Sequence, residues 1–508
     1  MRIPKGMSSL AVGVRLMLAA AILVLTLAGC GGGGGGGGNS SGTPTSSGSG
    51  GSSGGGSQAA TVTSMSVDKG TTAGGTNSNV QGTNFKVGAV VLVGGNPATV
   101  AGAITSTSIP ISTPAGTAGA ASVSVTNPGE STVTLAGAFT YMVPPTGTQV
   151  DHPVVPLAGM QIVVTFLATD SVDAGQVNGS AVGATVNNGN HTATFTVPPG
   201  TAGPVSIALG NNGVFGTPFQ ISRRGATIGN NDGSPAKNLV LNGAVSTLTN
   251  VAGAFNLRFF ANGWTPFLYV TIFGAGTLDR ILTTNGNSLG TTTVTGGVLR
   301  NADVDRDGNL VIAQGTAAQS ISRAFIAAAT ASATLVGATG VDTYCIAFVQ
   351  AALAANDTYW QGSLTNGTLT ERLASSNATG RTANIGATSL ITGMVYDDEA
   401  KVLWVFDQST GIVSAVELQF TGLPIVPAVT TGLSNGADLC IVAGSDIIAI
   451  PNRDSADART AAFSLSAGTL IWNQGASQAG VSIRSVQIVT NKIFWTLSNG
   501  DIIVAQIQ

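Results

Sequence analysis

The residues best suited to binding a metal ion are three aspartates, Asp303, Asp305 and Asp307, which alternate with other residues ahead of Gly308. This spacing is typical of the start of a calcium loop, because calcium prefers carboxylate oxygens. An EF-hand would also need a glutamate at loop position twelve, where Gln314 stands, and two flanking helices. The alternative is an Asp-Gly hairpin between two strands that holds no metal. The sequence therefore offers one calcium candidate and no other cofactor site.

A second acidic group, Asp397-Asp398-Glu399, could supply paired carboxylates for acid–base catalysis. It stands before a strand-like segment at the same place in its repeat as the first aspartate group, so we interpret both as turns and this one as solvated. The chain has two histidines, His152 and His191, which we expect to be ordinary surface or turn residues. Because neither histidine lies in residues 237–508, that part of the chain lacks a Ser-His-Asp triad and a zinc site with histidine ligands. We expect no catalytic residues and no enzymatic activity.

The N-terminus carries the marks of an export signal. Basic residues precede an apolar run over residues 16–27, which is short for a membrane-spanning helix. The run ends in Leu-Ala-Gly followed by Cys30. This ending looks like the lipobox of a bacterial lipoprotein, and the resemblance implies that Cys30 is lipidated once the signal peptide, residues 1–29, is removed. The alternative is an ordinary secretory signal with a chance cysteine.

Residues 30–58 are rich in glycine and serine, with eight consecutive glycines after Cys30, and we expect a flexible tether. The second residue of the mature chain would be Gly31 and not an aspartate. The N-terminus resembles those of lipoproteins from bacteria with two membranes, and this resemblance implies that a chain without an aspartate at that position goes to the outer membrane. Both orientations, toward the periplasm and toward the cell surface, stay open. The expected partners are a lipid bilayer, bound through the acylated N-terminus, and an unidentified protein or glycan.

Charged residues make up 8% of the chain, against roughly 25% in ordinary soluble proteins. The formal net charge is −3, and no lysine or arginine cluster follows the signal. We therefore expect no nucleic-acid partner, because phosphate binding depends on concentrated positive charge.

Two small β domains are expected after the tether. Residues 82–85 read Gly-Thr-Asn-Phe and residues 139–141 read Phe-Thr-Tyr, and residues 59–143 thereby resemble the IPT/TIG family of immunoglobulin-like domains. The motif Pro-Ala-Gly-Thr-Ala-Gly at 114–119 recurs, with one change, 84 residues later, in a segment that lacks Gly-Thr-Asn-Phe. We therefore expect a degenerate second β-sandwich over residues 144–222 and a linker over 223–236.

A repeat of about 45 residues fills residues 237–508. Strand centres are separated by 43, 48, 44, 45 and 46 residues, and they fall at Tyr269, Ile312, Trp360, Trp404, Ala449 and Trp495. Periods of this length in an all-β sequence indicate a β-propeller with four strands to a blade. The pattern resembles six-bladed propellers with NHL-like repeats, and seven blades is the rival count. Since the last repeat lacks a fourth strand, we predict that residues 237–248 supply it and close the ring.

Two cysteines remain in the repeats. Cys345 and Cys440 occupy matching places two repeats apart, too far for a disulfide, so we predict two buried free thiols. The tryptophans are expected in the blade cores, with one or two as candidates for a sugar-binding face.

These features favour an all-β surface lipoprotein, in which two sandwiches form a stalk and the propeller presents a face to a protein or glycan. The alternatives are an extracytoplasmic enzyme acting on a carbohydrate or lactone at the propeller axis, and a structural subunit of a cell-surface assembly. Fold alone does not choose among them.

Overall fold

The computed structural model describes residues 58–507 apart from internal gaps. The gaps are 152–153, 156, 201–202, 225–240, 263–264, 295–297, 306–309, 316–319, 325–332, 339–341, 434, 443–444, 466, 476–479 and 490–491. The predicted signal peptide, Cys30 and nearly all of the tether lie outside the described residues. The chain divides into two units, residues 1–58 and 59–508, and only the second is described below. Within the described residues no helix has the length and apolar character needed to cross a bilayer.

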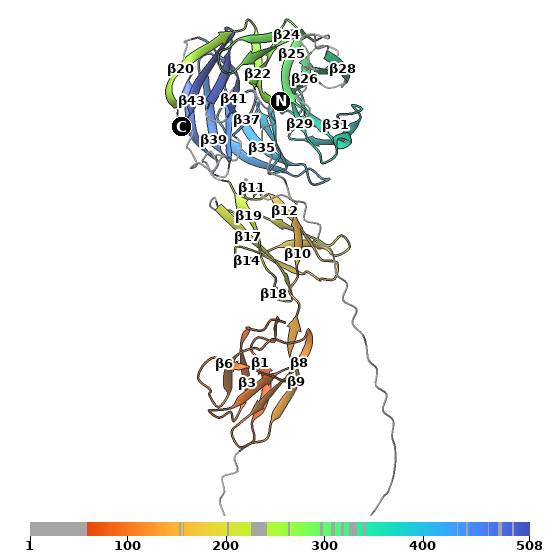
Figure 1. Ribbon diagram of the computed structural model, residues 1–508, viewed down its shortest axis with the longest axis vertical. Coiled ribbons are helices and arrows are strands. Elements are labelled where there is room, and N and C mark those ends of the chain that lie inside the picture. Colours follow the sequence, from red (N-terminus) through yellow and green to blue (C-terminus); the bar gives the residue numbers. More distant parts are fainter. Residues whose placement is uncertain are drawn as a thin grey trace, which may run out of the picture. The chain divides into compact units, whose positions relative to one another are not determined.

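The first domain is a pair of β-sheets (Figure 1). One sheet has the order β1 (Thr61–Met65), β3 (Asn77–Thr83), β7 (Ser108–Ser112), β6 (Thr99–Val100). The other has the order β2 (Lys69–Thr71), β9 (Val133–Met142), β8 (Gly119–Thr126), β4 (Val90–Val93), β5 (Asn96–Pro97). Alternate residues of β3 and β7 are buried, as a period of two requires of a strand with one face on the core. Phe139 and Tyr141 pack edge to face in that core.

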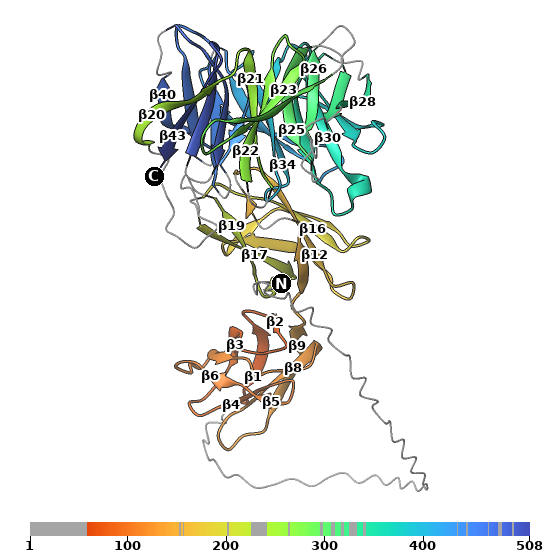
Figure 2. The same ribbon diagram turned by 45° about the horizontal axis from the view of Figure 1, so that its top comes forward.

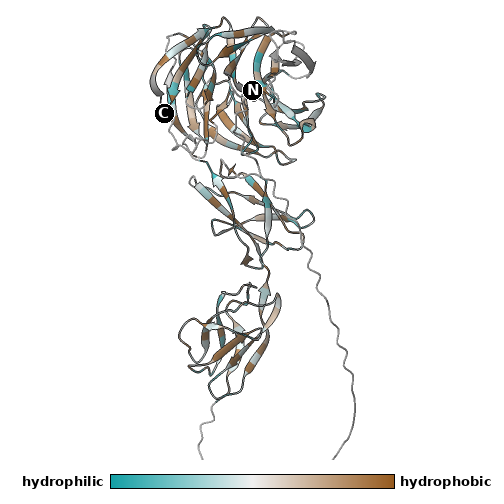
Figure 3. Ribbon diagram, viewed as in Figure 1, coloured by the Kyte–Doolittle hydropathy of each residue, from teal (hydrophilic) through white to brown (hydrophobic). Residues whose placement is uncertain are grey.

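The second domain repeats this strand order, including the parallel pairing of its short edge strand. Its first sheet is β10 (Gly147–Val150), β12 (Gln161–Phe166), β16 (Thr192–Thr196), β15 (Ala184–Asn187). Its second is β11 (Val154–Val155), β19 (Phe219–Arg223), β17 (Gly203–Asn211), β13 (Ala174–Val177), β14 (Ser180–Val182), with β18 (Val214–Phe215) beside β17. Apolar and polar positions alternate along many of these strands (Figure 3), which places one side of each sheet on a core.

The rest of the chain forms four-stranded antiparallel sheets (Figure 2). The first sheet is β21 (Ala254–Asn262), β22 (Thr265–Ile272), β23 (Thr277–Leu282), β24 (Ser288–Thr293); the second is β25 (Val298–Val304), β26 (Leu310–Gly315), β27 (Ser320–Ala324), β28 (Ala333–Ala338). The third is β29 (Thr343–Val349), β30 (Thr358–Ser363), β31 (Thr368–Leu373), β32 (Thr379–Asn384), with the single 3-10 turn η1 (Ala354–Asn356).

The fourth sheet is β33 (Ile391–Asp397), β34 (Val402–Asp407), β35 (Ile412–Glu417), β36 (Ile425–Thr430). The fifth is β37 (Cys440–Ile441), β38 (Ile447–Pro451), β39 (Arg459–Ser464), β40 (Thr469–Gly475). The sixth is β41 (Ile483–Val489), β42 (Lys492–Leu497), β43 (Asp501–Ile507), β20 (Leu241–Asn250). The strand predicted to close the ring is therefore confirmed, since β20 pairs antiparallel with β43.

In the first five sheets the inner strand is the first strand in chain order. In the sixth sheet the inner strand is β41, and β20, which precedes all six sheets in the chain, forms the outer edge. Each inner strand contacts the next, and β41 contacts β21, so that the circuit is closed. Because the ring is closed, every inner strand has another inner strand on each side. The first and last strands of the ring, β20 and β43, pair within one sheet, so the edge of β43 is covered. Three tryptophans lie in second strands of these sheets and are buried, as predicted: Trp360, Trp404 and Trp495.

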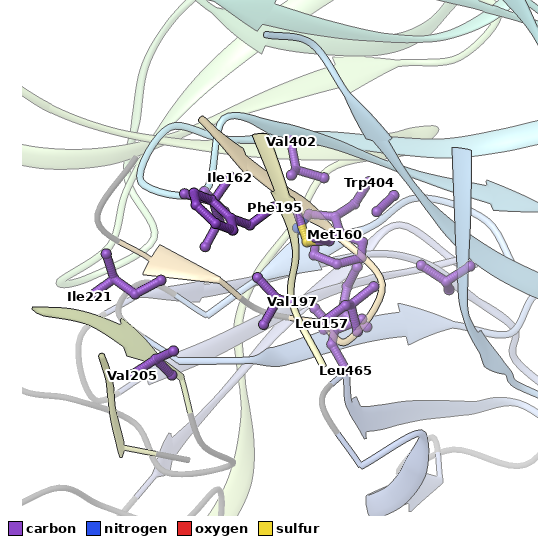
Figure 4. Packing of buried hydrophobic residues seen from close by; sticks show 14 of the residues in the cluster. Leu157, Met160, Ile162, Phe195, Val197, Val205, Ile221, Val402, Trp404 and Leu465 are labelled. Atoms are coloured by element: carbon purple, nitrogen blue, oxygen red, sulfur yellow. The ribbon is translucent and has the colours of Figure 1, made fainter. Parts of the chain in front are cut away.

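One apolar cluster joins the second sandwich to the fourth and fifth sheets of the ring. Figure 4 shows Leu157 and Met160 of the sandwich beside Trp404 of β34. Next to this cluster, the backbone N–H of Gln161 donates to the buried Glu417 carboxylate at 3.0 Å. Because Glu417 is fully buried, the bond lies in surroundings of low dielectric constant, which strengthen it.

Candidate functional site

A β-bulge recurs near the start of the inner strands. In five of the six sheets the register between the inner and second strands shifts by one residue at this point. A bulge leaves its extra residue out of the hydrogen-bond ladder and re-aims the side chain, which is why bulges are common beside functional sites. The extra residues are Phe255, Arg300, Tyr344, Thr392 and Arg484.

Four of these side chains form, together with Arg453, a continuous cluster that we call the arginine cluster. The Arg453 guanidinium carbon lies 4.9 Å from the ring centroid of Tyr344 and 5.2 Å from that of Phe255. Arg484 lies 5.4 Å from the Phe255 ring, and Arg300 lies 5.6 Å from the Tyr344 ring. Arg453 follows β38 in the fifth sheet and contacts residues of the first and third sheets, each of which is two sheets away around the ring.

The arginine cluster carries excess positive charge. Arg300 forms an ion pair with Asp342 at 2.8 Å. Within the part of the chain that the structure describes, no ion pair is formed by Arg453 or Arg484. Burial, followed by repulsion from Arg484 and Arg300, lowers the pKa of Arg453 to about 10. Three cations thus converge with one acidic partner among the described residues.

Next to the arginine cluster, a buried polar network surrounds the carboxylate of Asp438. Its carboxylate accepts hydrogen bonds from Arg258 at 2.9 and 3.2 Å and from the Ser485 hydroxyl at 2.5 Å. The side-chain amides of Asn256 and Asn301 donate to it at 3.1 and 3.3 Å. These asparagines and Ser485 each directly follow a bulge residue, so the network joins the first, second, fifth and sixth sheets.

The backbone of Asp438 is strained to reach this position. Its φ is 62°, a left-handed conformation that costs a non-glycine residue roughly 1 kcal/mol or more. Gly393 makes room for it, because a Cβ there would lie 2.7 Å from the Asp438 carbonyl oxygen. Burial would lower the pKa of Arg258, but the contacts with Asp438 outweigh that effect and raise it, so Arg258 stays charged. The Asp438 carboxylate is held by donors on several sides.

The calcium candidate is only partly described. Asp303 lies in β25, where its carboxylate accepts the backbone N–H of Phe348 at 2.7 Å and lies 3.9 Å from Nε of Arg258. Burial raises the pKa of Asp303, and Arg258 offsets only part of this rise. Asp305 is buried at the end of the strand, and Asp307 lies outside the described residues. Strands β25 and β26 pair as the arms of the predicted hairpin, and the described residues contain no cluster of three metal-ligating side chains.

The prediction that Asp397, Asp398 and Glu399 form a solvated turn is wrong for one residue. Asp397 is 5% exposed and accepts both guanidinium N–H groups of Arg224, at 2.5 and 3.0 Å. Arg224 also pairs with Glu399 at 2.5 Å, but Glu399 and Asp398 are both exposed, as predicted. The sequence shows an acidic turn but not the cation that pairs with it, because Arg224 directly follows β19 of the second sandwich, in the segment expected to be a linker. That expected linker began at 223, but Arg223 is the last residue of β19.

The other singled-out residues are placed as follows. Cys345 and Cys440 are buried free thiols, as predicted. His191 lies in a turn with a positive φ, beside Phe166, and His152 is outside the described residues.

Sequence reasoning missed the arginine cluster, because no motif links its members. A signal does exist: the bulge residues Phe255, Arg300, Tyr344 and Thr392 are separated by 45, 44 and 48 residues. If the repeats are aligned on their inner strands, instead of on the aromatic strand centres, these polar and aromatic residues fall at the same position of the alignment.

Comparison with known proteins assigns one domain. Residues 60–141 match the IPT/TIG domain family, which confirms the resemblance of the first sandwich. No curated protein matches the chain.

Among solved structures the chain is similar to the β-propeller domain of Cps50 (Swd1) from Myceliophteria thermophila, at 12% identity and a TM-score of 0.39, over 52% of this chain and 100% of that one. It is similar to virginiamycin B lyase from Staphylococcus aureus in a complex with quinupristin, at 12% identity and 0.38, over 64% and 94% of the two chains. A protein of unknown function from Bacteroides thetaiotaomicron matches at 10% identity and 0.36, over 89% and 98%. These scores are too low to bear on activity.

Proposed function

We propose that this protein is a lipid-anchored, extracytoplasmic binding protein of the cell envelope, with the outer membrane as its site. Lipidation of Cys30 and the glycine-rich tether would hold it at the bilayer, and two TIG-like sandwiches would act as a stalk. A six-bladed propeller would present the binding face. The observation that carries the proposal is the arginine cluster, in which bulges of the ring bring cationic and aromatic side chains together.

The use of the carboxylates supports binding over catalysis. The buried Asp438 carboxylate accepts hydrogen bonds from four side chains, and Asp303 accepts two backbone N–H groups. Carboxylates that accept this many hydrogen bonds are fixed in orientation and have few lone pairs left, whereas a general acid or base must be free to exchange a proton with substrate. We therefore propose that the propeller binds its ligand and catalyses no reaction.

The anchor is tested by growing cells with radioactive palmitate and comparing the full chain with Cys30→Ala. We expect label in the natural chain and none in the variant, which should also be mislocalised. Equal label in both would contradict lipidation at Cys30. Protease treatment of intact cells then separates surface from periplasmic exposure.

The binding function is tested with the purified full chain immobilised through its C-terminus. We expect it to retain a component of the cell-envelope fraction, protein or polysaccharide, that an equally loaded, heat-unfolded chain does not retain. Equal retention by both would contradict a folded binding face.

A further inference from the structure

We propose that the arginine cluster is a ligand site for the carboxylate groups of an acidic polysaccharide. The inference rests on the proposed binding function and names the ligand class of the same face. It is carried by the charge of Arg300, Arg453 and Arg484, by the bulges that orient Arg300 and Arg484, and by buried polar atoms at the site that have no hydrogen-bond partner among the described residues.

The first argument is that the protein itself does not neutralise the cluster. Converging guanidinium groups repel one another, and Asp342 balances only Arg300 among the residues described. The aromatic rings hold the guanidinium planes in place, since cation–aromatic contacts of this length are attractive. Burial first, and repulsion from Arg484 and Arg300 second, lower the pKa of Arg453 to about 10, and an anion placed beside Arg453 would offset both effects.

The second argument comes from polar atoms that lack a partner. Tyr344 is 8% exposed, and its hydroxyl makes no hydrogen bond to any described residue. The Nε–H of Arg453 is likewise buried without an acceptor in the described part of the chain. Leaving such groups unpaired costs free energy, so they mark a place where a bound group with oxygen atoms is expected.

The third argument concerns the kind of anion. Arginine presents a planar fork of N–H groups that matches a carboxylate in two bonds. Phe255 and Tyr344 are 9% and 8% exposed, so the face offers cations rather than the large apolar anchors on which protein partners depend. A polymer of sugar acids supplies regularly spaced carboxylates together with hydroxyls that can accept from Arg453 and Tyr344.

The test is isothermal titration of the full chain with tri-galacturonate, with its methyl ester as the uncharged counterpart. We expect binding of the acid and at least a tenfold weaker affinity for the ester, because one charge-assisted contact is worth about that much. Arg453→Gln and Arg484→Gln should each weaken binding about tenfold or more. Lys492→Gln, which removes one positive charge from the end of the sixth sheet remote from Arg484, should change it by less than twofold.

Further probes separate the sources of the anion. A sulfated dextran or a hexaglutamate peptide that binds tighter than tri-galacturonate would overturn the assignment to carboxylated sugars. Equal affinity for acid and ester, or an Arg453→Gln variant that binds normally, would overturn the role of the cluster while leaving the binding function intact. Arg453→Lys guards against misfolding: with a native melting transition it should still bind more weakly than the natural chain, because it lacks the fork.

Discussion

The guanidinium carbon of Arg453 lies 4.9 Å from the ring centroid of Tyr344, although the two residues belong to the fifth and third sheets of the ring. The same group contacts Phe255 of the first sheet. One arginine thus connects three alternate sheets at the end where the inner strands begin. The arrangement links the repeat to the function proposed for it, because each contact partner stands at a bulge.

Replacing Asp438 by asparagine should destabilise the ring strongly. The change leaves Arg258 buried without its carboxylate partner, and breaking a buried pair in this way costs about 3–5 kcal/mol. Urea denaturation of the full chain measures the loss. Asp398→Asn is the matched control, because Asp398 pairs with Lys401 at the surface and should change stability by less than about 1 kcal/mol. Similar effects of the two changes would contradict a central role for Asp438.

Replacing Arg224 by methionine should loosen the second sandwich from the ring. Asp397 would lose its cation in a buried place, at a cost of about 3–5 kcal/mol. Calorimetry of the full chain should then resolve a separate, earlier transition that the natural chain lacks. Lys401→Met changes a cation at the end of the turn that holds Asp397, with a side chain that is 39% exposed, and should leave the profile unchanged. A single unchanged transition in the Arg224 variant would show that the apolar cluster alone joins the two domains.

A disulfide across the closing strand should form only in the correct register. Ser246 of β20 faces Val504 of β43, so cysteines at these two positions are expected to oxidise and to stabilise the ring by about 2–4 kcal/mol. Cysteines at Ser246 and Gln506, two residues out of register, should stay reduced. Gel mobility with and without reductant distinguishes the outcomes. Oxidation of the second pair but not the first would mean that β20 pairs differently.

The two buried thiols should be inert until the ring unfolds. Burial raises the pKa of Cys440 to about 11 and that of Cys345 further, so neither forms thiolate at neutral pH. In the Cys30→Ala chain we expect no reaction with a disulfide reagent at pH 8 and two equivalents in denaturant. Because the unfolded thiol ionises first, stability should fall as the pH rises from about 9 to 11. Prompt reaction of the native chain would contradict the burial.

The architecture was largely predictable, and the site was not. The period of the strand centres indicated four-stranded repeats, and the unpaired segment before them indicated closure by β20, because both depend on local pattern. The Arg224–Asp397 pair depends on how two domains meet, which no local pattern records. The cluster around Arg453 depends on bulges. Inner strands that are buried on both faces, such as β29, have no polar–apolar alternation in which one extra residue would stand out.

Hydrogen exchange of the full chain, with and without tri-galacturonate, tests the account most directly. We predict that the sugar acid slows exchange at the starts of the inner strands, near Phe255, Arg300, Tyr344 and Arg484, and that Arg453→Gln abolishes this protection. Protection confined to the two sandwiches, or none at all, would contradict a binding face built on the arginine cluster.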